Sequence, residues 1–114
     1  MELQVLPKID RRPFFRVLYM KIRFYMDPDT GLPHIYKHEV REDEVEDVLQ
    51  KPGEDRPGKD NSRIAMGQTR DGRYLRVIYA PDPDPDSLFI ITAYDLVGKP
   101  LKAYRRRGRR RQRR

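Results

Sequence analysis

SRIAMGQTRDGRYLRVIYA, from Ser62 to Ala80, consists of two apolar runs on either side of an Asp-Gly pair. In the second run Leu75, Val77 and Tyr79 alternate with other residues, which is the period of a strand with one buried face. Asp-Gly between two such runs is a strong signal for a tight turn. The sequence therefore predicts an antiparallel hairpin over residues 62–80.

The flanking segments predict more strands. LFIITAY (Leu88–Tyr94) is apolar on both faces and indicates a central strand, reached through the stiff surface connection PDPDPDS (Pro81–Ser87). Upstream, PFFRVLYMKIRFYM (residues 13–26) predicts a strand centred on Lys21–Tyr25. His34–Lys37 is expected to form a short edge strand.

Two helices are expected. In Arg41–Gln50, Val45, Val48 and Leu49 form one apolar stripe among acidic residues, and Lys51-Pro52-Gly53 ends the helix. Residues 51–61 are expected to form an exposed, mobile loop, and residues 101–106 a short final helix. The predicted fold class is α+β, with an antiparallel sheet of about four strands, these two helices and a disordered basic tail.

One domain, over residues 20–104, is predicted between two dissimilar ends. Residues 1–19 are an uncertain N-terminal extension, because Met20 is a plausible alternative start. Residues 105–114 form an arginine-rich tail. The chain has 114 residues, which suits a single domain.

Three strings resemble a known group of proteins: KHEVREDEVEDVL (Lys37–Leu49), SRIAMGQTRDGRYLRVIY (Ser62–Tyr79) and IITAYDLVGKPLKAYRRR (Ile90–Arg107). Together they are similar to the BrnT-type toxins and to a neighbouring family of uncharacterised small domains, over about residues 21–107. Glu39 stands where that group usually has glycine. Arg41 stands where it favours a Ser or Thr N-cap, so no capping box is expected.

The resemblance implies a RelE/ParE-like fold, in which helices pack on one face of an antiparallel sheet. For the toxins it also implies RNA cleavage, restrained by an antitoxin protein encoded alongside. Such metal-independent cleavage needs a proton acceptor, a proton donor and cations around the phosphate. The candidate catalytic residues are Lys37, His38, Arg76 and Tyr104.

Each candidate has a chemical reason and a simpler alternative. His38 can act as acid or base near neutral pH, or it can close the turn into the helix. Arg76 and Arg63 can stabilise phosphate charge, or they can pair with acidic residues on a solvated sheet face. Tyr104 can supply a proton or a stacking surface. No metal or cofactor is expected, because the chain has no cysteine and His34 and His38 lie in a segment expected to be extended.

Arginines dominate the last ten residues, RRRGRRRQRR. Removing these eight from the 25 basic residues leaves 17 against 18 acidic ones, so the tail carries the net charge of +7. Such a run neutralises phosphates and can fold along RNA. With Arg63, the expected nucleic-acid-binding residues are Arg105, Arg106, Arg107, Arg109, Arg110, Arg111, Arg113 and Arg114.

The leading interpretation is a toxin-type ribonuclease that binds RNA. The alternatives are a non-catalytic RNA- or ribosome-associated module, and an interaction protein whose basic tail meets an acidic partner. The sequence has no long apolar run typical of a signal peptide or a membrane span, so a cytoplasmic location without membrane contact is expected.

Overall fold

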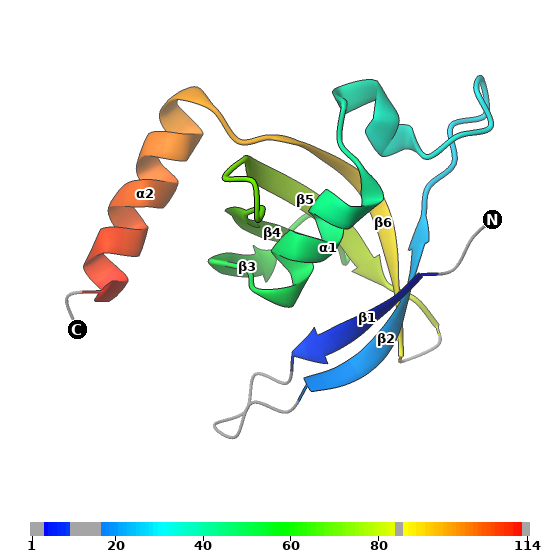
Figure 1. Cartoon of the computed structure of the whole chain (residues 1–114), viewed down its shortest axis with the longest axis horizontal. Coiled ribbons are helices and arrows are strands. Elements are labelled where there is room, and N and C mark those ends of the chain that lie inside the picture. The colour runs from blue at the N-terminus through cyan, green and yellow to red at the C-terminus, as the bar shows by residue number, and fades with distance from the viewer. Residues whose placement is uncertain (1–3, 10–16, 84–85, 113–114) are drawn as a thin grey trace.

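A six-stranded mixed sheet with helices on it makes up the protein (Figure 1). The structure is a computed structural model that describes residues 4–9, 17–83 and 86–112. The strands, in sheet order, are β1 (Gln4–Ile9), β2 (Val17–Phe24), β6 (Ser87–Asp95), β5 (Tyr74–Pro81), β4 (Arg63–Gln68) and β3 (Glu54–Pro57). The helices are η1 (His34–His38), α1 (Glu42–Gln50) and α2 (Gly98–Gln112). The fold is α+β, as predicted.

The hairpin expected over residues 62–80 is present as β4 and β5, which pair antiparallel from Arg63 opposite Tyr79 to Gln68 opposite Tyr74. Gly72, in the turn, has a φ of 91°, a conformation that glycine adopts without a steric penalty. β6 lies between β5 and β2, so the prediction of a central strand is confirmed.

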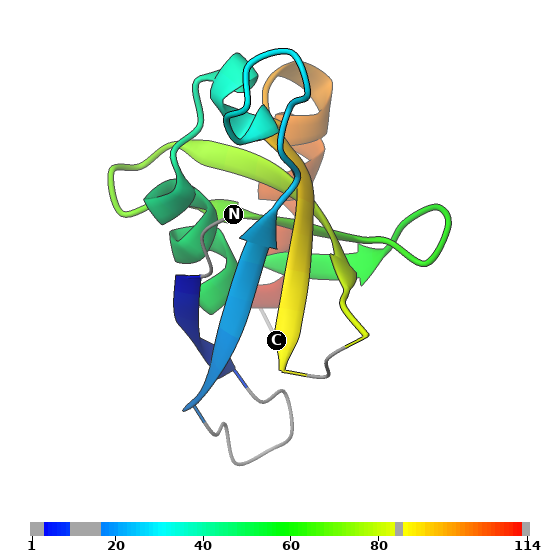
Figure 2. The ribbon, with the colours of Figure 1, turned by 90° about the vertical axis from the view of Figure 1, so that its right-hand side faces the viewer.

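The sheet departs from the prediction in strand number and direction. β2 runs parallel to β6, with Ile22 opposite Leu88, so the sheet is mixed rather than antiparallel (Figure 2). This pairing joins two strands that enclose η1, α1 and the β3–β4–β5 meander in sequence. Parallel neighbours need such a long connection, and no local signal specifies it.

Two strands were not expected. β3 lies inside the segment 51–61, where an exposed loop was predicted, and it pairs with β4 from Glu54 opposite Met66. β1 pairs antiparallel with β2, so the sheet extends into the N-terminal residues that the sequence left unassigned. Residues 13–16 of the strand expected over 13–26 lie outside the described residues.

The core lies between α1, η1 and one face of the sheet. α1 contributes Val45 and Val48, both fully buried, while Leu49 of the expected stripe packs at the margin. Their partners on the sheet are Ile22, Phe24, Ala65, Leu75, Val77, Tyr79, Ile90 and Ala93. Burying a side chain of this size stabilises the fold by roughly 1.5–3 kcal/mol. The alternating residues Leu75, Val77 and Tyr79, which the sequence assigned to one buried face, are thus all in the core.

His34–His38 forms a 3-10 helix, so the predicted edge strand is wrong. Pro33 precedes it, and the backbone N–H of Val40 donates to the carbonyl of Ile35. This hydrogen bond lies within the segment and does not join it to a neighbouring strand. The helix ends at Glu39, which adopts the left-handed region with a φ of 57°. Glycine, which the BrnT-like group usually has here, fits that conformation without strain.

α1 begins at Arg41 with half of a capping box. The Glu44 carboxylate accepts the backbone N–H of Arg41 at 2.9 Å, a contact that the sequence does not predict. The reciprocal contact needs an acceptor on the N-cap side chain, and a guanidinium has only donors. The Arg41 side chain instead binds Asp43 at 3.0 Å.

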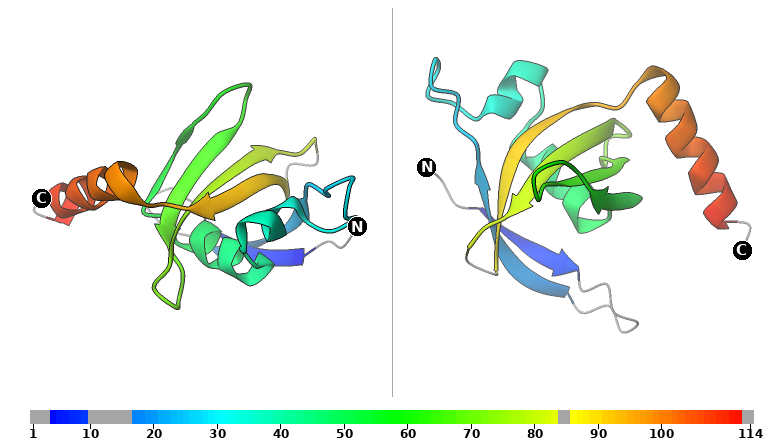
Figure 3. Two further views of the ribbon diagram at one scale, coloured as in Figure 1. Left: turned by 90° about the horizontal axis from the view of Figure 1, so that it is seen from above. Right: turned by 180° about the vertical axis from the view of Figure 1, so that it is seen from behind.

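The C-terminal helix is longer than predicted. α2 continues through the arginines to Gln112, so the expectation of a disordered tail is wrong for residues 105–112, while Arg113 and Arg114 lie outside the described residues. Arginine favours the helix, and the helix gains contacts with the sheet that are described below. α2 and η1 lie toward opposite ends of the molecule (Figure 3). Among the described residues, no helix is long and apolar enough to cross a membrane.

Candidate nucleic-acid interface

The outer face of the sheet, opposite α1, carries several of the candidate residues. Val77 and Ala93, directly opposite each other, both belong to the core. Side chains alternate along a strand, so their neighbours Arg76 and Tyr94, also paired, lie together on the outer face. Tyr74 lies on the same face, two residues before Arg76. This face thus combines aromatic and basic side chains.

A row of rings leads from this face to η1. The His38 ring centroid lies 5.8 Å from that of Tyr94 and 5.5 Å from that of His34. The row continues from His34 to Tyr25 at 5.8 Å and from Tyr25 to Phe89 at 6.4 Å. His38 and Arg76 therefore each neighbour Tyr94, His38 through its ring and Arg76 as the cross-strand partner.

Arg76 differs from most arginines of the sheet because it has no ion pair within the described residues. Its Nε is buried without a hydrogen-bond partner, and so is Oγ1 of Thr92. Both residues lie on the outer face, since Thr92 pairs with Ile78 in the register that pairs Tyr94 with Arg76. A buried donor without an acceptor costs about 1–3 kcal/mol. These two polar groups mark a place where an added anion or water would find a partner.

Arg63 lies on the other side of the sheet. It pairs with Tyr79 in the register, and its Nε donates to the Asp55 carboxylate at 3.0 Å. Asp55 also accepts the hydroxyl hydrogen of Tyr79. Arg63 thus forms an ion pair with an acidic residue, one of the two roles considered for it from the sequence. It lies on the opposite face of the sheet from Arg76.

Lys37 is bound to a turn. Its Nζ lies 2.6 Å from the carboxylate of Asp27, which is 2% exposed. Asp27 also accepts the backbone N–H of Asp29 at 2.8 Å. The hydrogen bond from Lys37, and next that from Asp29, lowers the pKa of Asp27. Lys37 therefore neutralises a buried carboxylate in the turn before η1.

Tyr104 of α2 contacts the outer face at Tyr74, away from His38 and Tyr94. Its ring meets that of Tyr74 edge-on, with centroids 6.1 Å apart. Its hydroxyl lies against Gly53 so closely that a Cβ there would be 1.9 Å away. Burial raises the pKa of Tyr104, which favours its protonated form. Tyr104 is therefore grouped with Tyr74 rather than with His38 and Tyr94.

The arginines of α2 divide between two sides of the helix. Arg107 donates to the Glu54 carboxylate at 2.6 and 3.0 Å, and Arg111 donates to it at 3.0 Å. At about 100° per residue, Tyr104, Arg107 and Arg111 share the side that faces the sheet. The rest of the helix surface carries what we call the outer basic stripe: Lys99, Lys102, Arg105, Arg106, Arg109 and Arg110, of which Arg105 and Arg109 also border the space between α2 and the sheet. Within the described part of the chain, none of these six has a carboxylate partner.

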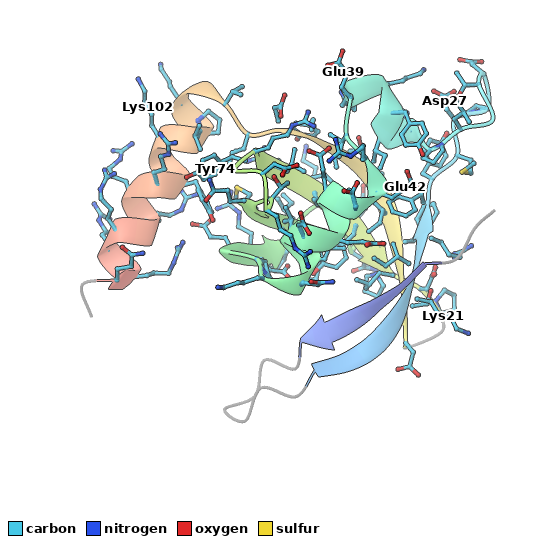
Figure 4. All side chains as sticks on the ribbon, viewed as in Figure 1. Lys21, Asp27, Glu39, Glu42, Tyr74 and Lys102 are labelled. Atoms are coloured by element: carbon cyan, nitrogen blue, oxygen red, sulfur yellow. The ribbon has the colours of Figure 1, made fainter. Side chains whose placement is uncertain are left out.

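Figure 4 shows this division, with Lys102 on the side of α2 away from the sheet and Tyr74 between α2 and β5. The guanidinium of Arg105 lies over the Tyr74 ring, 4.8 Å from its centroid. Tyr74, Tyr94 and Glu54 were missed as site residues. Tyr94 could have been found as the cross-strand neighbour of Arg76, whereas no local sequence signal connects Glu54 with an arginine fifty residues later.

Within the described residues, no group of three His, Cys, Asp or Glu side chains is placed to hold a metal ion. His34 and His38 contact each other through their rings, edge to face.

Comparison with protein families finds one match, over residues 34–95, to a domain of unknown function, DUF4258. A search of curated proteins and a search of solved structures each find no match. The matched segment runs from the start of η1 to the end of β6, so it includes His38, Arg76 and Tyr94 but not α2. It covers more than half of the chain, and the protein therefore belongs to the DUF4258 family.

Proposed function

We propose that this protein binds RNA, with α2 as the main contact to the phosphate backbone. The observation that carries the proposal is the outer basic stripe, whose four arginines have no carboxylate partner among the described residues. Residues four apart on a helix lie about 6 Å apart along its axis, so Arg105 and Arg109, and likewise Arg106 and Arg110, can contact separate phosphates. Each contact releases counterions, which favours a polyanion over a single carboxylate.

The outer face of the sheet supports RNA over a uniform polyanion. Tyr74 lies beside α2, and Tyr94 and its row of rings continue toward η1. Single-stranded RNA is recognised largely by stacking of unpaired bases on aromatic and guanidinium planes. A surface with cations at one end and rings along the face is suited to both parts of such a ligand.

The test compares two charge-matched triple variants in a salt titration of single-stranded RNA binding. The first replaces Arg106, Arg109 and Arg110 with glutamine, which removes stripe charges without touching Glu54. Binding should weaken, and the slope of log affinity against log salt should flatten by about 2, from roughly 0.7 per contact. The control replaces three exposed basic residues outside α2 with glutamine: Lys21, Lys59 and Arg70.

The control variant loses the same charge, but away from α2, so it should keep the slope of the unmodified protein. Equal losses in the two variants would mean that net charge alone drives binding, and would reject α2 as the interface. Absence of RNA binding by the unmodified protein would reject the function. Equally tight binding of polyglutamate would favour an acidic protein partner instead.

A second candidate function is metal-independent RNA cleavage, as in the BrnT-type toxins that the sequence resembles. The observation that favours it is that His38 and Arg76 each neighbour Tyr94. In this chemistry His38 exchanges a proton with the 2′-hydroxyl or the leaving oxygen, and Arg76 stabilises charge on the phosphate. A RelE/ParE-like activity would also bring an antitoxin partner.

His38→Ala should lower cleavage by on the order of a hundredfold, the usual scale for losing a general acid or base. His34→Ala is the matched control, because it removes the adjacent imidazole of the same ring row. Equal cleavage by His38→Ala and the unmodified protein would reject His38 as the proton carrier. If the unmodified protein binds RNA without cleaving it, the function is binding alone.

A further inference from the structure

A groove of about 450 Å³ separates α2 from the sheet. Gly53, the end of β4 and the start of β5 form one wall, and residues 104–112 of α2 form the other. Its volume lies within the range of roughly 300–1,000 Å³ that is usual for small-ligand sites. The polar and aromatic side chains that line it are Gln68, Tyr74, Tyr104, Arg105, Arg109, Arg111 and Gln112.

The chemistry of these side chains matches the parts of a nucleotide. Tyr74 and Tyr104 supply aromatic surface, with centroids 6.1 Å apart. Gln68 and Gln112 supply amides, which can hydrogen-bond the edge of a base. The amide nitrogen of Gln68 already donates to the carbonyl of Gly72 at 3.0 Å, which leaves its oxygen as the acceptor. Arg105 and Arg109, which have no carboxylate partner within the described residues, supply charge for a phosphate, whereas Arg111 is paired with Glu54.

Arg105 covers the Tyr74 ring in the absence of a ligand, with its guanidinium carbon 4.8 Å from the ring centroid. A base that stacks on Tyr74 would take this place. Stacking of a base on an aromatic ring is generally stronger than a solvent-exposed cation–π contact. The displaced guanidinium then remains beside the ligand and can bind its phosphate, so the exchange leaves no charge without a partner.

We propose that this groove binds one unpaired nucleotide of an RNA strand whose backbone lies along the outer basic stripe. The proposal rests on the RNA binding proposed above and adds a requirement for an unpaired base. An acidic peptide would use the arginines but not the two rings and two amides. A base inside a duplex has its faces covered by neighbouring pairs and is excluded from the groove.

The test uses the full chain and a short single-stranded RNA that contains one 2-aminopurine, together with the same RNA annealed to its complement. We expect the unmodified protein to bind the single strand more tightly and to quench the 2-aminopurine fluorescence. Tyr74→Leu should weaken single-strand binding about tenfold, the scale of losing one base–aromatic stack. It should leave the salt slope unchanged, because the phosphate contacts remain.

Two further variants make the result specific. Tyr36→Leu removes a tyrosine of η1 that is 42% exposed and lies outside both the groove and the ring row, so it should leave binding unchanged. Because Tyr74 also contacts α2, Gln68→Ala provides a second probe that keeps the tyrosine pair, and it should reduce the preference among the four bases. Circular dichroism of each variant checks that α2 remains helical.

The possible failures are distinguishable. Equal affinity for the single strand and the duplex, or unchanged affinity in Tyr74→Leu, would overturn the groove proposal and leave RNA binding by the stripe intact. Absence of RNA binding by the unmodified protein would overturn both.

Discussion

Replacing Glu54 with glutamine removes the charge that attaches α2 to the sheet. The carboxylate is 11% exposed and accepts hydrogen bonds from Arg107 and Arg111, whose side chains are 37% and 46% exposed. Hydrogen bonds to charged groups contribute about 1.5–3 kcal/mol, whereas exposed ion pairs contribute about 0–1 kcal/mol. The contribution of this partly exposed cluster should fall between these two ranges. We therefore expect Glu54→Gln to reduce the free energy of α2 docking by about 1 kcal/mol, which is roughly a fivefold shift toward undocked α2.

Amide hydrogen exchange over residues 105–112 measures this shift directly. Exchange in Glu54→Gln should be about fivefold faster there and unchanged in β4 and β5, because the hairpin does not depend on α2. Glu46→Gln, a carboxylate of α1, is the control and should leave exchange in α2 unchanged. If exchange over residues 105–112 is the same in Glu54→Gln, the ion pairs do not hold the helix and the argument is refuted.

Acid should have the same effect as the substitution. Burial raises the pKa of Glu54, but the hydrogen bonds from Arg107 and Arg111 together outweigh burial, and the net pKa is lowered. A lowered pKa means that docking favours the ionised carboxylate. Its contribution is therefore complete above the ordinary pKa of a glutamate and is lost as the pH falls through the lowered value.

Three other predictions concern stability. Arg73→Met leaves the buried Glu44 carboxylate without its 3.0 Å ion pair and should lower the free energy of unfolding by about 2 kcal/mol in urea titrations, whereas Arg70→Met, at an 82% exposed side chain, should change it by less than about 0.5 kcal/mol. Burial and a neighbouring carboxylate raise the pKa of Tyr79 to about 12. The contribution of the protonated hydroxyl to the free energy of unfolding is therefore complete below about pH 10 and lost toward pH 12. Thermal melts of Tyr79→Phe at alkaline pH should lack this loss. Glu39→Gly relieves a left-handed backbone and should raise the free energy of unfolding by about 0.5–1 kcal/mol, and a lower value would refute the strain.

Local signals in the sequence predicted the elements whose contacts are local or simply apolar. The Asp-Gly pair specified the β4–β5 hairpin, and the two-sided apolar run specified β6 as a central strand. β3 was not predicted, because its sequence Glu-Asp-Arg-Pro has no apolar–polar alternation that would indicate a strand. Its place depends on backbone pairing with β4 and on contacts such as Asp55 with Arg63, which no local pattern reveals.

The sequence also predicted only part of the candidate site, namely the residues whose chemistry is evident without knowing the fold. His38 and Arg76 were proposed from their chemistry, and in the structure each of them neighbours Tyr94. Arg63 and Arg76 look equivalent in sequence, but the hairpin register places them on opposite faces. The helical arginines were expected to be disordered, because the contacts with Glu54 that hold them come from a strand that was itself missed.

The β1–β2 hairpin has a consequence for the exposed edge of the sheet. Ile22 and Phe24 of β2 are 0% and 4% exposed, yet they lie outside the family segment, residues 34–95. A chain reduced to that segment would leave one edge of the apolar strand β6 unpaired, and such edges recruit strands from other molecules. β2 occupies this edge, and β1 then ends the sheet with Pro7, which has no backbone N–H to offer a further strand. The hairpin thus protects the sheet against edge-to-edge aggregation.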